Sequence, residues 1–209
     1  MEITKTEKKV FLNALSDYYG LSQSDLILNL DIEIKNGEPK NIRNIIARLI
    51  CKKIENDNKI NLQNLLIKTI RTNNNRVVLE SMSFSQIKYN EIIKESWEES
   101  DLYKNLSSEF VFFIFNIKSK EDKNPILQSA KIWKMNKSDL DLASKFWELT
   151  KENVRIGDYK NFITIKNNFI CHVRTKGLNS KDLMKTPQGT IEPKRGYWLN
   201  ASYLKTQIF

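Results

Sequence analysis

Leu65-Leu66-Ile67-Lys68-Thr69-Ile70 is the stretch of sequence on which the predicted fold depends. Its apolar and β-branched residues make residues 62–72 a predicted β-strand. Asn73-Asn74-Asn75 favours a turn, and residues 76–84 favour a returning strand. The sequence therefore predicts a β-hairpin in the middle of the chain.

Helices precede this hairpin and alternate with strands after it. Thr4 and Glu7 form a capping box for a helix that stops at Gly20, and a second helix begins near Pro39 and reaches Ile54. Ser138 and Asp141 indicate the start of a later helix. The remaining predicted elements are helices over 86–97, 101–106 and from Ala201, strands over 110–117, 126–135, 162–165, 169–174 and 196–200, a charged turn over 118–124 and a long basic loop over 175–194.

Composition limits the class of protein. With 209 residues, of which 40% are apolar and 10% aromatic, the chain can bury one substantial core, so we expect a single domain of mixed α/β (α+β) type. Its net charge of +9 favours an acidic partner, either nucleic acid or an anionic membrane. The longest apolar run, residues 110–115, is too short to span a bilayer, and residues 1–5 lack a signal-peptide pattern. The two cysteines, Cys51 and Cys171, lie far apart, which indicates a reducing cytoplasm and no zinc or redox motif.

The last fifty residues carry most of the positive charge. Residues 160–209 contain nine Lys and Arg against two acidic residues, which gives +7 of the net +9. Arg can hold a guanine edge with two hydrogen bonds, Lys can hold phosphate, and aromatic rings can stack on sugars and bases. Alternation along an extended strand points Arg174 and Lys176 the same way, whereas Tyr197 and Trp198 point to opposite faces, one into the core and one outward. This segment therefore predicts nucleic-acid binding.

The strand at Leu65–Ile70 also has the form of a nuclease metal site with one group missing. In metal-dependent nucleases, such a strand carries a carboxylate two residues before a Lys, so that both point to one face. The carboxylate binds a hard divalent cation, and the Lys orients or activates the attacking water. Lys68 is present, but Leu66 replaces the carboxylate.

Several motifs carry a family resemblance that extends from about Ile42 to the end of the chain. They are Lys68-Thr69-Ile70, Glu80 with Phe84, Trp97-Glu98-Glu99-Ser100, Val173-Arg174-Thr175-Lys176, Thr186-Pro187-Gln188-Gly189, and Gly196-Tyr197-Trp198-Leu199-Asn200 with Tyr203-Leu204. In this order and spacing they resemble the MutH family of mismatch-repair and GATC-cutting restriction nucleases. The resemblance implies a MutH-like restriction-endonuclease fold, with a central mixed β-sheet flanked by helices and two lobes around a DNA cleft.

The chain departs from that family at its catalytic positions. Members that cut also carry an acid before the strand, for which Glu55 and Asp57 are substitutes at unconvincing offsets, and a further Lys whose position falls on Asn105. The resemblance therefore implies a vestigial site at Lys68, Leu66 and Asn105, with no catalytic residue and no metal in this domain. It implies Mg²⁺ only for a parent nuclease.

The recognition segments are kept, which resembles a second, regulatory nuclease-like domain in the C-terminal half of a GATC restriction endonuclease. The resemblance implies a fragment or C-terminal half of a larger bacterial, cytoplasmic enzyme, with a helical part over 1–60, a degenerate core sheet over 61–135 and a DNA-recognition part over 136–209. Its partners would be GATC duplex DNA and the catalytic N-terminal domain of the same enzyme. The expected DNA contacts are Arg174, Lys176, Trp198, Asn200, Lys194, Arg195, Lys181 and Lys185.

Two other functions remain open from the sequence. One is an active magnesium-dependent endonuclease that uses Lys68 with relocated carboxylates such as Asp57 and Glu80. The other is a basic module that binds RNA or DNA without sequence preference.

Simpler structural roles are also open for individual residues. His172 can be a packed or hydrogen-bonding strand residue, Lys68 a solvent-facing one, and Glu80 a surface acid. Core packing explains Trp133, Trp147 and Phe146 by their helical and strand spacing, and a solvated helix face explains Lys52 and Lys53.

Overall fold

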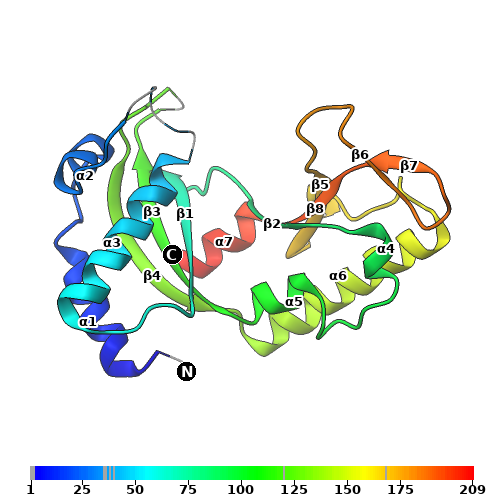
Figure 1. Cartoon of the computed structure of the whole chain (residues 1–209), viewed down its shortest axis with the longest axis horizontal. Coiled ribbons are helices and arrows are strands. Elements are labelled where there is room, and N and C mark those ends of the chain that lie inside the picture. The colour runs from blue at the N-terminus through cyan, green and yellow to red at the C-terminus, as the bar shows by residue number, and fades with distance from the viewer. Residues whose placement is uncertain (1–2, 35–36, 38, 40, 120, 168) are drawn as a thin grey trace. The chain divides into compact units, whose positions relative to one another are not determined.

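A computed structural model describes residues 3–34, 37, 39, 41–119, 121–167 and 169–209 of the chain. Two predictions fall partly outside the described residues. The N-terminal segment without a signal-peptide pattern includes Met1 and Glu2, and the predicted charged turn includes Lys120. The chain divides into two compact units (Figure 1). Unit 1 comprises Met1–Leu79, Ser108–Lys134 and Ile208–Phe209, and unit 2 comprises Glu80–Ser107 and Met135–Gln207.

The sheet of unit 1 is built around the most apolar strand. Its strands are β1 (Leu65–Asn73), β3 (Glu109–Ile117) and β4 (Ile126–Lys134), in the order β1-β3-β4. β1 runs parallel to β3, and β4 runs antiparallel to it. Residues 110–115 of β3 are all buried, which is typical of a central strand covered on both faces. The predicted strands 110–117 and 126–135 are thereby confirmed.

The predicted hairpin is wrong. The turn at Asn73–Asn75 exists, but only an isolated bridge, Thr72 to Val78, follows it. β1 instead pairs along its whole length with β3, and the strand expected to return, β2 (Met82–Gln86), joins the sheet of unit 2. Pairing with the fully buried β3 gives β1 more apolar contact than a local hairpin would provide.

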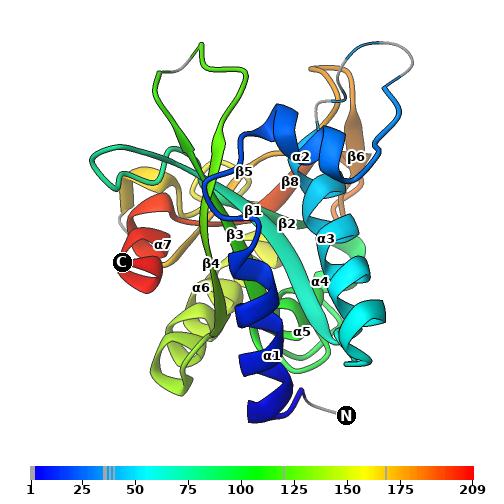
Figure 2. The ribbon, with the colours of Figure 1, turned by 90° about the vertical axis from the view of Figure 1, so that its left-hand side faces the viewer.

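Helices α1 (Lys5–Ser16) and α3 (Ile42–Asn58) cover one face of the unit 1 sheet (Figure 2). The predicted capping box is confirmed. The Thr4 side chain accepts a hydrogen bond from the Glu7 backbone N–H, and the Glu7 side chain accepts one from the Thr4 backbone N–H. Between α1 and α3 in the sequence is a short helix, α2 (Gln23–Asn29). The prediction missed it, although Ser22 and Asp25 form a second capping box. The core beneath the helices contains Phe11, Leu15, Ile46, Ile50, Val111, Phe113 and Phe115.

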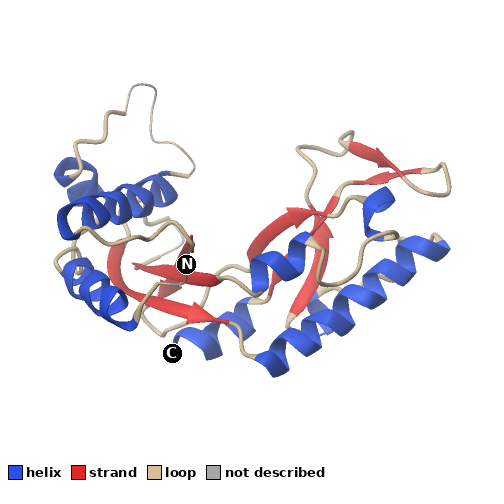
Figure 3. Ribbon diagram, turned by 60° about the horizontal axis from the view of Figure 1, so that its bottom comes forward, coloured by secondary structure: helices blue, strands red, loops and turns tan. Residues whose placement is uncertain are grey.

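Unit 2 contains an antiparallel sheet with strand order β2-β8-β5, where β5 is Cys171–Thr175 and β8 is Arg195–Leu199. The long helix α6 (Lys137–Ile156) packs on this sheet through Phe146, whose ring centroid lies 6.1 Å from that of Tyr197 (Figure 3). α5 (Asp101–Leu106) and α7 (Ala201–Ile208) confirm two further predictions.

Other details of unit 2 differ from the prediction. α6 is capped by Asn136, which accepts from the Asp139 backbone, two residues before the predicted cap. The predicted helix over 86–97 contains only α4 (Tyr89–Ile92), because β2 already occupies residues 82–86. The predicted strand over 162–165 is a loop followed by the short 3-10 helix η1 (Ile165–Asn167), and the predicted loop over 175–194 contains a hairpin of β6 (Leu183–Lys185) and β7 (Ile191–Pro193).

The predicted fold class is confirmed, since the chain mixes helices with parallel and antiparallel strands. Trp133, Trp147 and Phe146 are buried as expected, and Lys52 and Lys53 are exposed on α3. Within the described residues, no helix is both long and apolar enough to cross a membrane.

Candidate nucleic-acid interface

The sheet of unit 2 has one apolar face and one basic, aromatic face. Val173, Tyr197 and Leu199 are buried on the side that α6 covers. Strand alternation places His172, Arg174 and Trp198 on the opposite side, and the register pairs His172 with Trp198 and Arg174 with Gly196. The prediction that Tyr197 and Trp198 point to opposite faces, with one in the core, is confirmed: Tyr197 is buried and Trp198 is only partly covered.

We call His172, Arg174, Lys176, Gly196 and Trp198 the basic-aromatic face. Arg174 is exposed, and its guanidinium carbon lies 5.3 Å from the centroid of the Trp198 ring. The His172 ring stacks on the same indole, with centroids 6.4 Å apart and planes 22° apart. A guanidinium that lies over an aromatic ring is attracted to it by a cation–π interaction, and its N–H groups can still donate to a ligand.

Gly196 provides the space that Lys176 occupies. A Cβ atom at Gly196 would lie 2.6 Å from the Lys176 Cδ atom and 3.0 Å from the Ser85 carbonyl oxygen. The Lys176 side chain therefore crosses the β8 backbone at a position without a side chain. Burial lowers the pKa of Lys176. Arg174 and Lys176 thus lie on the same face, as alternation predicts.

Asn200, one of the expected DNA contacts, lies inside the unit. It is 2% exposed, its Nδ2 donates to the Phe169 carbonyl, and its Oδ1 contacts Nδ1 of His172. This arrangement places a proton on Nδ1 of His172. Burial, followed by the charge of Arg174, lowers the pKa of the imidazole despite the Asn200 hydrogen bond. His172 therefore has the hydrogen-bonded strand role that its sequence context allowed.

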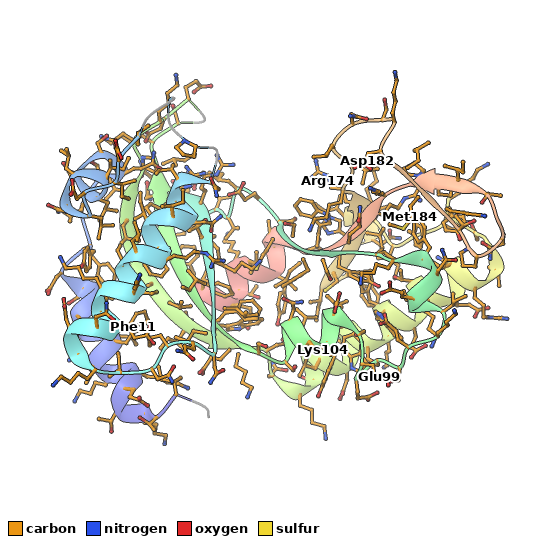
Figure 4. All side chains as sticks on the ribbon, viewed as in Figure 1. Phe11, Glu99, Lys104, Arg174, Asp182 and Met184 are labelled. Carbon is orange, nitrogen blue, oxygen red and sulfur yellow. The ribbon has the colours of Figure 1, made fainter. Side chains whose placement is uncertain are left out.

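The other four expected contacts do not gather on the basic-aromatic face. Arg195 precedes Gly196 on β8, so its side chain lies on the opposite side of the sheet. Its guanidinium carbon is 5.1 Å from the centroid of the Phe162 ring, and its Nη1 atom is 3.6 Å from the Glu192 carboxylate. Lys194 forms an ion pair of 2.5 Å with Asp182. Lys181 and Lys185 are exposed on the loop before β6 and on β6 itself. Figure 4 labels Arg174 on β5 and Asp182 on that loop.

Lys160 and Thr164, which the sequence did not mark as site residues, also lie in this region. The segment 159–165 runs along the free edge of β5, because the Val173 N–H donates to the Ile163 carbonyl at 2.8 Å. Lys160, Thr164 and Arg174 line the same pocket, of about 410 Å³. The sequence shows the positive charge of Lys160. Its place beside β5 was not predicted, because residues 162–165 were expected to form a strand and instead form a loop and η1.

The vestigial positions can be placed within their own units. On β1 of unit 1, Leu66 and Lys68 are two residues apart, so their side chains lie on the same face of the strand. Both are partly buried, and Lys68 pairs in register with Phe112 of β3. On α5 of unit 2, Asn105 donates from Nδ2 to the Asp101 carbonyl at 2.6 Å. Lys104, beside it, is exposed.

The side chains at these vestigial positions do not suit a hard divalent cation, which needs several oxygen ligands. Leu66 offers none, and the nearby acid Glu55 accepts a hydrogen bond from the Leu62 backbone at 2.9 Å, which fixes the loop before β1. Asp57 and Glu80 are exposed. In the part of the chain that the structure describes, no group of three or more His, Cys, Asp or Glu side chains could hold a metal ion.

The two cysteines are also unsuited to ionisation. Burial raises the pKa of Cys51 to about 12 and that of Cys171 still further. Both thiols are free and buried, so neither offers a thiolate at neutral pH.

Comparison with known proteins relates the chain to DNA-processing enzymes. Residues 52–144 match the sequence model of the DNA mismatch repair enzyme MutH, so the chain is related to the MutH family and shares its restriction-endonuclease-like fold. The matched range contains Leu66, Lys68 and Asn105 but ends before the basic-aromatic face.

A second relative is a restriction enzyme. The chain is 28% identical over 185 residues to the type II restriction enzyme Sau3AI of Staphylococcus aureus, an alignment that covers 69% of this chain and 38% of the relative. The chain therefore spans well under half of that enzyme. The chain is thus similar in part to a mismatch repair enzyme and in part to a type II restriction enzyme.

Proposed function

We propose that the chain is a DNA-binding effector domain that recognises GATC duplex and no longer cuts it. The observation that carries this proposal is the contrast between its two halves. Leu66 replaces the metal-binding carboxylate beside Lys68, whereas Arg174, Trp198 and Lys176 form an organised, partly exposed cationic and aromatic surface.

The basic-aromatic face supports base recognition in a duplex. Arg174 has the donor geometry to hold the two acceptors on the major-groove edge of a guanine. The Arg174 side chain is exposed where it lies over the Trp198 ring, so its N–H groups can reach a ligand. Lys176, Lys181 and Lys185 can neutralise phosphates, which would fix the register of the domain on the duplex.

The relationship to a type II restriction enzyme supports the regulatory part of the proposal. A domain that binds the target without cutting it can favour an active arrangement of a separate catalytic domain, which would use Mg²⁺. Such coupling requires that DNA bind two states of the assembly with different affinity. The catalytic N-terminal part of a Sau3AI-like enzyme is the proposed partner.

Competition binding tests the proposal. A labelled GATC duplex bound to the chain in EDTA should be displaced by unlabelled GATC duplex at concentrations at least about a hundredfold lower than by a scrambled duplex, the scale set by a few specific base contacts. Equal competition by both duplexes would contradict GATC recognition and support a module that binds nucleic acid without sequence preference.

An active nuclease is the second candidate, favoured only by the presence of Lys68. Supercoiled plasmid containing GATC sites should remain intact in Mg²⁺ with an excess of the chain. Nicking that Lys68→Ala abolishes would establish the nuclease and overturn the loss of cleavage. Nicking that persists in Lys68→Ala would indicate a contaminant, and the preparation would have to be repeated after further purification.

A further inference from the structure

A pocket of about 410 Å³ opens at the free edge of β5, within unit 2. The segment 159–165 forms one wall, and β5 with the first residue of β8 forms the other. Its volume falls in the range of small-molecule sites in proteins. The lining residues with a chemical role are Tyr159, Lys160, Phe162, His172, Arg174 and Arg195.

The charged residues that line this pocket are cationic. Lys160, Arg174 and Arg195 line it, and none of its described lining residues is acidic, although Glu192 lies 3.6 Å from Nη1 of Arg195. Both guanidinium groups rest on aromatic rings, Arg174 on Trp198 at 5.3 Å and Arg195 on Phe162 at 5.1 Å. The pocket is therefore suited to a phosphate group.

The rest of the lining suits a heterocycle. Tyr159 and Phe162 meet edge to face, with centroids 6.1 Å apart, and they form an aromatic wall. His172 also belongs to the lining, and Asn200 contacts its Nδ1 atom. A cationic rim beside an aromatic wall combines the features that recognise a nucleotide.

Arg174 connects the pocket to the basic-aromatic face, since it belongs to both. We propose that the pocket receives one nucleotide of the bound DNA, rotated out of its base stack, with its phosphate on the cations and its base against Tyr159 and Phe162. This proposal rests on the proposed DNA-binding function and adds a specific deformation of the DNA to it.

Mismatched duplexes provide the test, because a mismatch lowers the cost of extruding a base. Affinities are measured by fluorescence anisotropy for GATC duplexes that each carry one mismatch in or beside the site. One mismatch position should tighten binding about tenfold, and 2-aminopurine at that position should change its fluorescence about threefold or more on binding.

Ile165→Trp is the informative variant, because Ile165 lines the pocket and is 58% exposed, so a larger side chain can fill the pocket without entering the core. It should remove the gain from the mismatch, so that mismatched and matched duplexes bind the variant with affinities within about threefold of each other. Leu142→Trp, at a 40% exposed position on α6 outside the pocket, is the matched control and should keep the gain.

The outcomes separate this proposal from the function on which it rests. If matched GATC duplex binds but no mismatch tightens binding, or if Ile165→Trp keeps the full gain, the pocket does not take a nucleotide and the DNA-binding proposal stands. If no duplex binds at all, both proposals fail.

Discussion

At the scale of single residues, Arg174 and Asn200 were both predicted to contact DNA, but they have different positions in the structure. Arg174 is exposed on the basic-aromatic face, whereas Asn200 is buried beneath it and holds His172. Position along a strand decides which role a residue takes, because alternation places successive side chains on opposite faces. The two residues should therefore respond to substitution in different assays.

Arg174→Ala should weaken binding to GATC duplex by about 1–3 kcal/mol and reduce the preference over a scrambled duplex, because a bidentate contact to a base is lost. Anisotropy titrations with both duplexes measure the two effects. Arg48→Ala, at an exposed position of α3, is the control and should leave the ratio unchanged. An unchanged ratio in Arg174→Ala would show that Arg174 does not read bases.

Asn200→Ala should lower the free energy of unfolding by about 1–3 kcal/mol, because buried polar groups of His172 and Phe169 lose their partner. Urea denaturation measures this loss. DNA affinity of the folded variant at low temperature should change far less than that of Arg174→Ala. A variant of full stability with lost DNA affinity would instead make Asn200 a direct contact.

At the scale of elements, the helix start and the hairpin of unit 2 depend on single polar side chains. Asn136 caps α6, although the sequence favoured Ser138 for that position. Gln188 joins the β6–β7 hairpin to the C-terminus of α6, because its Nε2 donates to the carbonyls of Val154 and Arg155, at 2.9 Å each. Tyr159 completes this contact by a hydrogen bond of 2.8 Å to the Gln188 Oε1 atom.

Asn136→Ala should destabilise the chain by about 1 kcal/mol, the usual cost of losing a helix cap. Ser138→Ala is the matched control and should cost much less, since the Ser138 hydroxyl only donates to Asn136. Thermal or urea unfolding of both variants distinguishes the two caps. Equal losses in the two variants would contradict the cap at Asn136.

Gln188→Ala should release the β6–β7 hairpin from α6 without unfolding the unit. Amide hydrogen exchange in residues 183–193 should accelerate by about tenfold or more, because local opening then costs less free energy. Exchange in β8 should stay at the level of the unsubstituted chain. Unchanged exchange in the hairpin would mean that contacts other than Gln188 hold it.

At the scale of the whole molecule, the local signals in the sequence predicted more than the long-range ones. Capping residues, the apolar strand 110–117 and the strand 196–200 marked elements that the structure contains. The partner of β1 was not predictable in this way, because parallel pairing with β3 depends on contacts between residues more than forty positions apart, such as Leu65 with Glu109. For the candidate site, alternation correctly placed Arg174 with Lys176. It could not reveal the pocket beside them, which depends on the loop 159–165.

Binding of GATC duplex in Mg²⁺ and in EDTA tests the central claim most directly. A domain without a working metal site should not bind GATC duplex more tightly in Mg²⁺ than in EDTA, because Mg²⁺ then acts only as a counterion that competes for the DNA phosphates. We predict a dissociation constant in Mg²⁺ that is equal to or larger than that in EDTA, a log-log salt slope in EDTA of roughly −5 for about six neutralised phosphates, and an uncut duplex. Affinity that rises strongly with Mg²⁺, lost in Lys68→Ala and accompanied by cleavage, would contradict the account.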